Sequence, residues 1–277
     1  MGRKILIIGN GFDLNLGLPT SYSHFLGSSH FKEILNTGNK IAEYLRDQMD
    51  IQNWVDVELS IKKYADKVSQ DDANFGTFRN DYKGLVERFS EYLRSIDIST
   101  IDVQSHAYNF LVENAITQSK VADIRIYNFN YTPTVKRILN NHGWPLEVIE
   151  GRHVHVHGEL NNNLIFGIQD ETSPTRFHSL VKKSMRPGFK TCNISDELLK
   201  GNNIEIFGYS LGETDEMYFS LPFSTLSRQS NMKSNMNIYY YGEDARDALN
   251  FRLDRLTRNK MLDFQKSVSL NWIPISE

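Results

Sequence analysis

Short apolar runs separated by longer amphipathic stretches set the pattern of this chain. Lys4–Ile8 is almost wholly apolar, and Ile124–Asn128 and Ile204–Phe207 are later short runs that also predict strands; all three lead into polar or glycine-bearing segments. Runs of this length predict strands that are buried on both faces, as in a parallel sheet. Further strands are predicted at His153–His157, Leu164–Gly167, Asn237–Tyr241 and Ser267–Trp272.

Helical periodicity dominates the region between the first two strands. Apolar residues recur at helical spacing in four stretches, which are Ile41–Met49, Trp54–Val68, Tyr82–Ile96 and His106–Gln118. These stretches predict a helical layer inserted at residues 21–120. We therefore expect a single α/β domain over residues 1–277, with a Rossmann-like, mostly parallel sheet that carries this insertion.

Residues typical of helix starts and ends predict the later helices. Thr132 and Pro133 suit the start of a helix that stops at Gly143, with Thr132 as the N-cap. A charged helix is expected from about 244 to 265. Between 169 and 200 the chain is polar and irregular, which predicts a loop-rich segment with the character of a lid.

Glu58 breaks the pattern of its own helix. It lies four residues after Trp54 and three before Ile61, so its carboxylate projects from the apolar side. A charged group in that position either closes a polar cleft or is paired inside the core. The sequence leaves both alternatives open.

The ends of the predicted strands carry the candidate chemistry. Gly9, Asn10 and Gly11 follow the first strand, and glycines there allow backbone N–H groups to converge on an anion. The segment is not a complete GxGxxG, because Leu14 stands at the third glycine, and no P-loop occurs. A tight turn from strand to helix is the alternative interpretation.

Asparagine and histidine stand at the next two strand ends. Asn128 and Asn130 precede a helix N-terminus, where open α/β sheets bind ligands. The three histidines of the His153–His157 strand share one face, but no Asp, Glu or Cys at ligand spacing joins them, so no metal site is expected. His157 abuts Gly158, where its ring can face a pocket as an acid–base group.

Composition narrows the classes of partner. The 277-residue chain is 40% hydrophobic, with a formal charge of −3 and a pI near 6.3, which argues against an extended nucleic-acid-binding face. Cys192 is the sole cysteine, so no intrachain disulfide can form. No apolar run approaches the roughly 20 residues that span a bilayer, and the first run is too short for a signal peptide. We expect a cytoplasmic protein without membrane contact.

Five motifs together resemble a known family. In chain order they are GNGFDLNLGLPTSY, WVDVE, NFNYT, HVHG and FGYSLGETD. The series is similar to that of the abortive infection AbiH family of bacterial anti-phage proteins, over nearly the whole chain. The resemblance implies a role in phage defence, with room for a phage-derived trigger or partner protein and for a homo-oligomer.

More distantly, the same motifs resemble the sirtuin-like nucleotide-binding fold, in which NAD is bound. In that resemblance Asn130 takes the place of the family's asparagine and His157 that of its catalytic histidine. Gly208 and Ser210 take its ribose and phosphate turn, whereas Thr132 stands where the pattern has Asp. The chain lacks the four zinc-binding cysteines of true sirtuin deacylases, so protein deacylation is not expected.

The resemblance implies an NAD hydrolase that cleaves the nicotinamide–ribose bond. Asn130 would fix ribose and water, and His157 would contact or deprotonate a ribose hydroxyl, or activate water. Asp13, which stands where the sirtuin-like pattern usually has Ser, would stabilise developing positive charge. The backbone of Gly9–Gly11 would hold the pyrophosphate. The residues expected to bind NAD are Gly9, Asn10, Gly11, Phe12, Thr20, Glu58, Asn128, Tyr131, Gly158, Gly208, Ser210 and Asp215.

Two other functions stay open. One is a binding module that senses a nucleotide or an ADP-ribose-like signal without catalysis, which Thr132 in place of Asp favours. The other is a metal-dependent nuclease or hydrolase that uses Asp13, Glu58 and a histidine. Sensitivity to a chelator would favour the metal-dependent enzyme over both the NAD hydrolase and the sensor.

Overall fold

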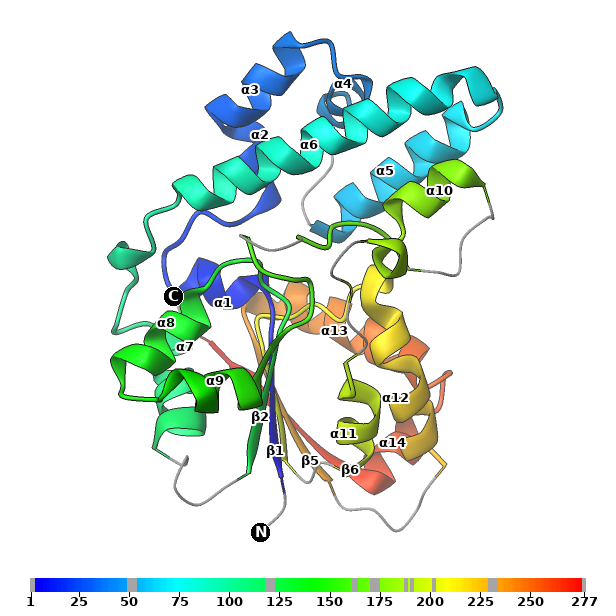
Figure 1. The fold of residues 1–277 in the computed structure, drawn as a ribbon. Coiled ribbons are helices and arrows are strands. Elements are labelled where there is room, and N and C mark those ends of the chain that lie inside the picture. Colours follow the sequence, from blue (N-terminus) through cyan, green and yellow to red (C-terminus); the bar gives the residue numbers. More distant parts are fainter. Residues whose placement is uncertain are drawn as a thin grey trace. The chain divides into compact units, whose positions relative to one another are not determined.

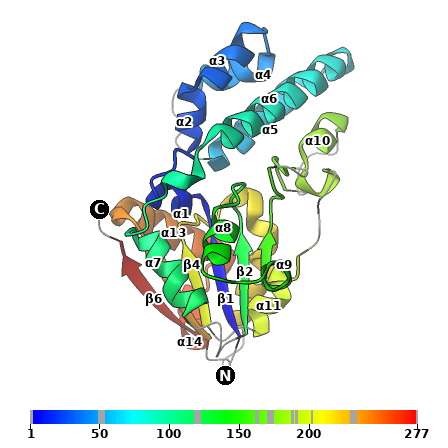
Figure 2. The same ribbon diagram turned by 60° about the vertical axis from the view of Figure 1, so that its left-hand side comes forward.

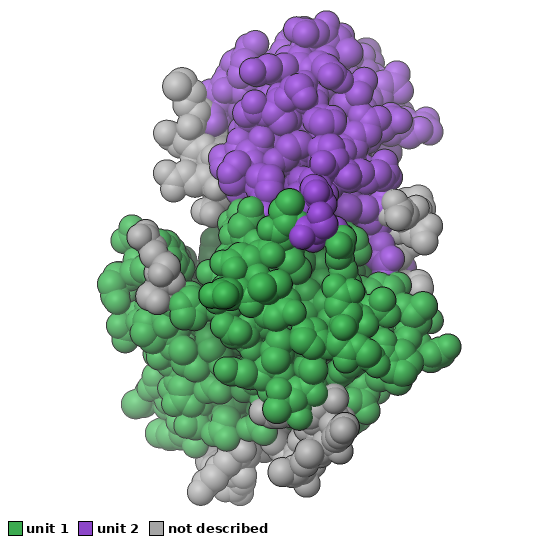
Figure 3. Space-filling model, turned by 90° about the vertical axis from the view of Figure 1, so that its left-hand side faces the viewer, with its two compact units in different colours: residues 1–17, 100–156, 191–277 green, residues 18–99, 157–190 purple. Residues whose placement is uncertain are grey.

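The structure is a computed structural model of the chain. It describes residues 3–48, 54–117, 123–160, 164–169, 175–186, 189, 192–200, 203–228 and 234–275, without the side chains of 54–56. The chain forms two compact units, each built from separate segments (Figure 3). Unit 1 comprises Met1–Gly17, Thr100–Val156 and Thr191–Glu277, and unit 2 comprises Leu18–Ser99 and His157–Lys190.

A six-stranded parallel sheet runs through unit 1, in the order β3-β2-β1-β4-β5-β6 (Figure 1). β1 pairs with β2 on one side and with β4 on the other, so the order of the strands reverses there. Open α/β sheets bind ligands at the carboxyl ends of the strands beside such a reversal. The predicted Rossmann-like sheet is confirmed. Its strands are β1 (Lys4–Ile8), β2 (Ile124–Asn128), β3 (His153–His155), β4 (Asn203–Phe207), β5 (Ser234–Tyr240) and β6 (Val268–Pro274).

The predicted strands agree best with the structure in the centre of the sheet. β1 and β2 have the predicted bounds, and every residue of β1 is buried, as a strand covered on both faces requires. β3 is shorter than predicted and ends at His155. Its continuation turns at Gly158, which has a φ of 75°. His157 therefore lies outside the strand and belongs to unit 2.

The strand predicted at Leu164–Gly167 is wrong. Among the described residues this segment, which lies in unit 2, pairs with no strand, and two of its backbone groups bond to side chains. The carbonyl of Phe166 accepts a hydrogen bond from the Tyr82 hydroxyl, at 2.5 Å, and the N–H of Gly167 donates to Glu58, at 3.1 Å. The apolar pattern indicated burial correctly but not the partners of the backbone.

Helices cover both faces of the sheet in unit 1. α7, α8 and α9 lie on one side of it, and α11, α12 and α14 lie on the other (Figure 1). The apolar core includes Ile204, Ile206 and Ile238 of the sheet, together with Leu249 and Leu253 of α13. The helices are α1 (Asn10–Asn15), α7 (His106–Leu111) with a π-helical turn (Val112–Ile116), α8 (Thr134–Asn141), α9 (Leu146–Arg152), α11 (Ile194–Lys200), the 3₁₀ helix Glu213–Tyr218, α12 (Ser220–Leu226), α13 (Gly242–Leu256) and α14 (Met261–Ser267).

Two predicted helices of unit 1 need correction. Pro133, not Thr132, stands at the N-cap of α8, and Gly143 ends it with a φ of 81°, as expected. The single charged helix predicted from 244 to 265 is two helices. Arg258 and Asn259 separate them, because both adopt a φ of 58°, in the left-handed region that an α-helix cannot include.

Unit 2 is mostly helical, and its longest helix, α6, contacts α3, α4 and α10 (Figure 2). Aromatic rings of Phe25, Phe31, Phe89 and Tyr92 pack together in its core. Helices therefore form where the insertion was predicted, whereas α7, at the end of that range, belongs to unit 1. The helices of unit 2 are α2 (Tyr22–Gly27), α3 (Ser29–Asn36), α4 (Lys40–Arg46), α5 (Trp54–Val68), α6 (Phe75–Ser95), α10 (Arg176–Val181) and the 3₁₀ helices Asp72–Asn74 and Lys183–Met185; the 3₁₀ helix Ile98–Thr100 lies where the two units meet in the sequence.

The loop-rich segment predicted at 169–200 contains more regular structure than expected. α10 and α11 lie within it, one in unit 2 and one in unit 1, and part of the range falls outside the described residues. In the described part of the chain, no helix is both long and apolar enough to cross a membrane.

Candidate functional site

Glycines at the carboxyl ends of β1 and β4 allow the two chain segments to touch. A Cβ on Gly9 would lie 2.6 Å from the carbonyl oxygen of Gly208, and one on Gly11 would lie 2.7 Å from the Cα of Gly208. Gly208 itself has a φ of 60°. These three residues are glycines because any side chain would push the strand ends apart.

The same contact uses the amide groups expected to bind pyrophosphate. The Gly9 N–H donates to the carbonyl of Phe207, at 3.0 Å, and the Gly11 N–H donates to that of Gly208, at 2.8 Å. Asn10, between them, begins α1 and is half-buried. The tight turn considered as the alternative is therefore what Gly9 and Gly11 form, and their amides are not available to cradle a phosphate.

The carboxyl group of Asp13 is buried close to the carboxyl end of β1. Asp13, in α1, is 1% exposed, and its Oδ2 accepts a hydrogen bond of 2.5 Å from the hydroxyl of Thr132. The hydroxyl of Thr134 donates in turn to Thr132, at 2.9 Å. Because α1 follows β1 and Thr132 follows the adjacent β2, neighbouring strand ends bring these side chains together.

Two asparagines complete the cluster on the β2 side. Asn128 is fully buried, and its Oδ1 accepts a 3.0 Å hydrogen bond from the backbone N–H of Asn130. The carbonyl of Asn130 lies 3.1 Å from Nδ1 of His155, at the end of β3. A carbonyl only accepts, so His155 carries its proton on Nδ1. We call Asp13, Asn128, Asn130, Thr132 and Thr134 the Asp–Asn cluster.

Several polar atoms of the Asp–Asn cluster lack a hydrogen-bond partner among the described residues. They are Oδ1 of Asp13, Nδ2 of Asn128, and both Oδ1 and Nδ2 of Asn130. Burying an unsatisfied polar atom costs about 1–3 kcal/mol, so native proteins rarely leave several together. Their concentration at the end of a parallel sheet indicates a place prepared for a polar ligand or for ordered water.

Burial also changes the ionisation of the cluster. Desolvation raises the pKa of Asp13 to about 6, against an ordinary value of 3.8, and hydrogen bonding from Thr132, Thr134 and Asn130 limits the rise. The Asn130 amide lies close enough to the Asp13 carboxyl group to lower its pKa, but it makes no well-directed hydrogen bond to it. A ligand that donates to Oδ1 of Asp13 would favour the ionised form.

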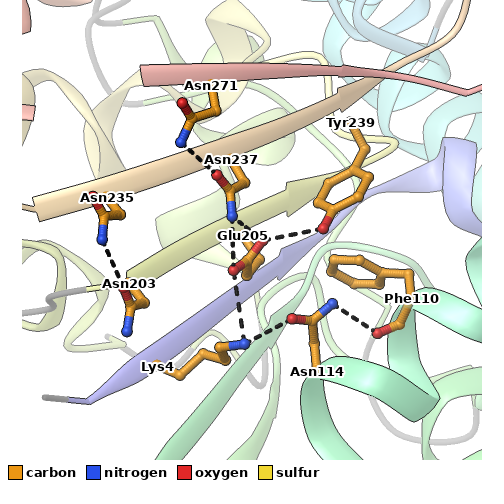
Figure 4. Close-up of polar contacts among 9 residues, drawn as sticks. All are labelled: Lys4, Phe110, Asn114, Asn203, Glu205, Asn235, Asn237, Tyr239 and Asn271. Carbon is orange, nitrogen blue, oxygen red and sulfur yellow. Dashed lines mark hydrogen bonds and ion pairs between the residues drawn. The ribbon is translucent and has the colours of Figure 1, made fainter. Parts of the chain in front are cut away.

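A second polar network in unit 1 differs from the Asp–Asn cluster, because its buried polar atoms are paired (Figure 4). Lys4 and Glu205 form a buried ion pair of 3.7 Å across β1 and β4. Asn114 accepts from Lys4, at 2.7 Å, and Asn237 donates to Glu205, at 3.0 Å. None of the buried polar side-chain atoms of these residues lacks a partner. A fully satisfied network of this kind holds strands together and leaves nothing for a ligand.

The end of β4 contributes aromatic packing beside the glycines. The Tyr209 ring stacks on Phe129, with centroids 4.2 Å apart, and its hydroxyl donates to Asp215, at 3.0 Å. Asp215 is buried, whereas Ser210 is exposed. Asp215, expected to bind NAD, thus anchors Tyr209. Phe12 is buried against Phe207, and Tyr131 is half-buried after β2.

The other predicted site residues belong to unit 2. Glu58 is paired inside the core, one of its two alternatives: its Oε2 lies 3.2 Å from Nζ of Lys183, and its Oε1 accepts from Gly167. The same Nζ lies 3.5 Å from Nε2 of His157. Thr20 is buried and Gly158 half-buried in this unit. We call Glu58, Lys183 and His157 the Glu–Lys–His cluster.

The structure thus groups the predicted residues in two sets, one in each unit. Asp13, Asn128 and Asn130 come together in unit 1, and Glu58 and His157 come together in unit 2. Two residues of these clusters were missed. Thr134 could have been found, since it lies two residues after Thr132. Lys183 could not, because nothing in its polar surroundings marks it as buried.

His153 and His155, two of the histidines predicted to share a face, lie in β3. Rings of His153 and His155 lie 4.6 Å apart, and burial lowers the pKa of His153, with the nearby His155 and Lys136 adding to the effect. Across the described ranges, no group of three or more His, Cys, Asp or Glu side chains is arranged to hold a metal ion.

Comparison with known proteins identifies a family for most of the chain. Residues 5–240 match the family model described as bacteriophage abortive infection AbiH. This range includes every residue of the Asp–Asn cluster and of the Glu–Lys–His cluster. No curated protein and no solved structure matches the chain.

Proposed function

The chain belongs to the bacteriophage abortive infection AbiH family and so serves anti-phage defence; from this premise we propose that it is an NAD hydrolase. The observation that carries the proposal is the set of unsatisfied buried polar atoms in the Asp–Asn cluster. Hydrolysis of NAD would remove a cofactor that an infected cell needs, which suits abortive infection.

The chemistry of the Asp–Asn cluster fits the ribose next to nicotinamide. Oδ1 of Asp13 accepts hydrogen bonds, Nδ2 of Asn128 donates them, and the Asn130 amide does both. A ribose diol has hydroxyl groups that donate and accept at once, so it can satisfy such a mixed set. The reversal of strand order beside β1 is where α/β sheets bind nucleotides.

In the proposed reaction, water replaces nicotinamide on the ribose. The bond between C1′ and the nicotinamide nitrogen breaks, and nicotinamide leaves with the bonding electrons. Water then adds to C1′ and loses a proton, which gives ADP-ribose. Ionised Asp13 would stabilise the positive charge on the ribose in the transition state, and Asn130 would orient ribose and water. For His157, a residue of unit 2, contact with a ribose hydroxyl or proton transfer stays a role that the resemblance alone implies.

The pyrophosphate needs donors other than the ones first expected. The Gly9 and Gly11 amides are bonded to carbonyls of the β4 end, so the proposal gives those residues a structural role. Gly208 has the same role, because both Gly9 and Gly11 approach it too closely for a Cβ atom to fit between them. Substitution of these glycines would therefore affect folding before it affected ligand binding.

A second candidate function is a nucleotide sensor without catalysis. The observation that favours it is the hydrogen bond from Thr132 to Asp13, since this pairing leaves the only carboxyl group of the Asp–Asn cluster partly occupied. A sensor would bind NAD or ADP-ribose and release it unchanged. Its ligand would still require Asn130.

Nicotinamide release from NAD by the purified protein, with and without phage lysate, tests the proposal. Asn130→Ala should abolish release and phage protection, because it removes both orphan atoms of that side chain. Asn140→Ala is the matched control, since Asn140 is exposed on α8. Absence of nicotinamide under every condition, with intact phage protection by Asn130→Ala, would contradict the hydrolase. Tight binding of unchanged NAD would identify the sensor.

A further inference from the structure

The Glu–Lys–His cluster of unit 2 is buried almost completely. Glu58 is 5% exposed, Lys183 is 0% exposed and His157 is 6% exposed. They come from α5, from the 3₁₀ helix Lys183–Met185 and from the segment after β3. Charged side chains at this depth are retained only when they are paired and hydrogen-bonded.

One short segment of backbone holds all three members. The Ile165 N–H donates to the carbonyl of His157, at 2.8 Å, and the Gly167 N–H donates to Oε1 of Glu58, at 3.1 Å. The Lys183 N–H donates to the carbonyl of Ile168, at 2.9 Å. Residues 165–168 therefore fix the relative positions of the three residues within unit 2.

The position of the proton on His157 follows from this arrangement. A lysine ammonium group has three N–H donors and no acceptor. Lys183 pairs with the Glu58 carboxylate at 3.2 Å, so it is charged, and its Nζ lies 3.5 Å from Nε2 of His157. In that contact only Nε2 can accept. The ring is then neutral, with its proton on Nδ1.

We propose that Lys183, held by Glu58, is a positioning residue that fixes His157 as the neutral Nδ1–H tautomer. The Nε2 lone pair of His157 is then committed to Lys183 and does not serve as a base. For its catalytic meaning this inference rests on the proposed NAD hydrolase. Of the roles that the resemblance implies for His157, it excludes removal of a proton by Nε2.

Nitrogen-15 NMR of histidine-labelled, full-length protein tests the inference directly. The imidazole signals of His157, assigned by their loss in His157→Gln, should show a protonated Nδ1 and an unprotonated Nε2 at neutral pH. A proton on Nε2, or on both nitrogens, in the wild-type protein would overturn the inference. This measurement needs neither NAD nor activity.

Removal of the lysine then tests its role. Lys183→Met alone leaves Glu58 charged and unpaired in the core, which can prevent folding. The double variant Glu58→Gln/Lys183→Met removes both charges, and Lys182→Met is the matched control on the neighbouring, half-buried lysine. We expect the double variant to lose the fixed Nδ1–H tautomer and Lys182→Met to keep it. A folded double variant with unchanged His157 signals would contradict the inference.

Activity provides a separate readout. Where the wild type releases nicotinamide, the double variant should release it roughly tenfold more slowly, the size of effect produced by loss of a group that orients a catalytic residue. Lys182→Met should stay near the wild-type rate. A fixed tautomer together with no hydrolysis by any variant would support the positioning role and refute the hydrolase, so the two failures are distinguishable.

Discussion

Asp13 shows how burial and function compete at a single residue. Its carboxyl group is buried beside threonine hydroxyls, yet one of its oxygens has no partner among the described residues. Thr132 illustrates the same competition. Its hydroxyl was predicted to cap α8, but it bonds to Asp13 instead. Leaving a buried carboxylate without a donor costs more than losing one N-cap hydrogen bond.

The pH dependence of stability tests the burial of Asp13. Its pKa rises from 3.8 to about 6 on folding, so the folded protein binds the proton more tightly than the unfolded chain. The contribution of Asp13 to stability is then fully present below pH 4, is lost as the pH rises through about 6, and is absent above that. The rise corresponds to about 3 kcal/mol. In Asp13→Asn this part of the pH dependence should vanish, so denaturant unfolding at pH 5 and pH 8 should differ less than in the wild type.

Burial raises the pKa of other carboxyl groups too, and the comparison with the variant removes their contribution. Asp81 is a suitable control, because burial raises its pKa and it lies in unit 2. Asp81→Asn should leave the contribution of Asp13 in place. An equal pH slope for the wild type and Asp13→Asn would show that Asp13 titrates normally.

At the scale of elements, the close approach of β1 and β4 depends on glycine. Gly208 has a φ of 60°, and a Cβ there would lie 2.5 Å from the carbonyl carbon of Gly11. Gly208→Ala should destabilise the protein by roughly 2–4 kcal/mol, from backbone strain and from the forced separation of the two strand ends. Denaturant unfolding measures the loss.

Gly143→Ala separates the two causes. Gly143 also has a positive φ, of 81°, but a Cβ there would meet nothing within 4 Å. Only strain remains, so the expected loss is about 1–2 kcal/mol. Equal losses at the two positions would show that the strand ends can separate at no cost.

The break between α13 and α14 gives a prediction of the opposite sign. Arg258 adopts a φ of 58°, which costs an L-residue about 1–2 kcal/mol but costs glycine nothing. Arg258→Gly should stabilise the protein slightly, by up to about 1 kcal/mol, because the greater freedom of glycine in the unfolded chain offsets part of the gain. Arg255→Gly, inside α13, should instead destabilise it by about 1 kcal/mol. Thermal unfolding of the two variants decides, and destabilisation by Arg258→Gly would contradict the prediction.

Sequence patterns predicted elements well where burial alone decides the structure. Lys4–Ile8 is apolar apart from Lys4, and all five residues are buried in the interior strand that the pattern predicted. Sequence patterns failed where a residue distant in the chain decides the structure. Leu164–Gly167 is apolar too, but the side chains of Tyr82 and Glu58 bond to its backbone. The interruption of the apolar face at Glu58 was visible in the sequence, whereas its partner Lys183 carries no local signal of burial. Local periodicity cannot identify a contact between residues that are remote in the chain.

At the scale of the whole molecule, each unit is built from segments that are separate in sequence. Unit 1 takes its sheet from three segments, and unit 2 closes its core with a segment that follows β3. Both clusters are therefore assembled from residues that are far apart in sequence, and each forms only when its unit folds. A ligand of the Asp–Asn cluster would bind the folded protein alone, and so must stabilise it.

ADP-ribose, the product of the proposed reaction, is the probe for this linkage because it cannot lose nicotinamide. At a concentration about 100 times its dissociation constant, it should stabilise the wild-type protein by about 2.7 kcal/mol against unfolding. Asn130→Ala should abolish the stabilisation, because it removes buried atoms that have no partner among the described residues and are open to a ligand. Asn140→Ala should retain it. Thermal unfolding across a series of ADP-ribose concentrations measures the effect. Stabilisation that survives Asn130→Ala would place the ligand away from the Asp–Asn cluster and remove the observation on which the hydrolase rests.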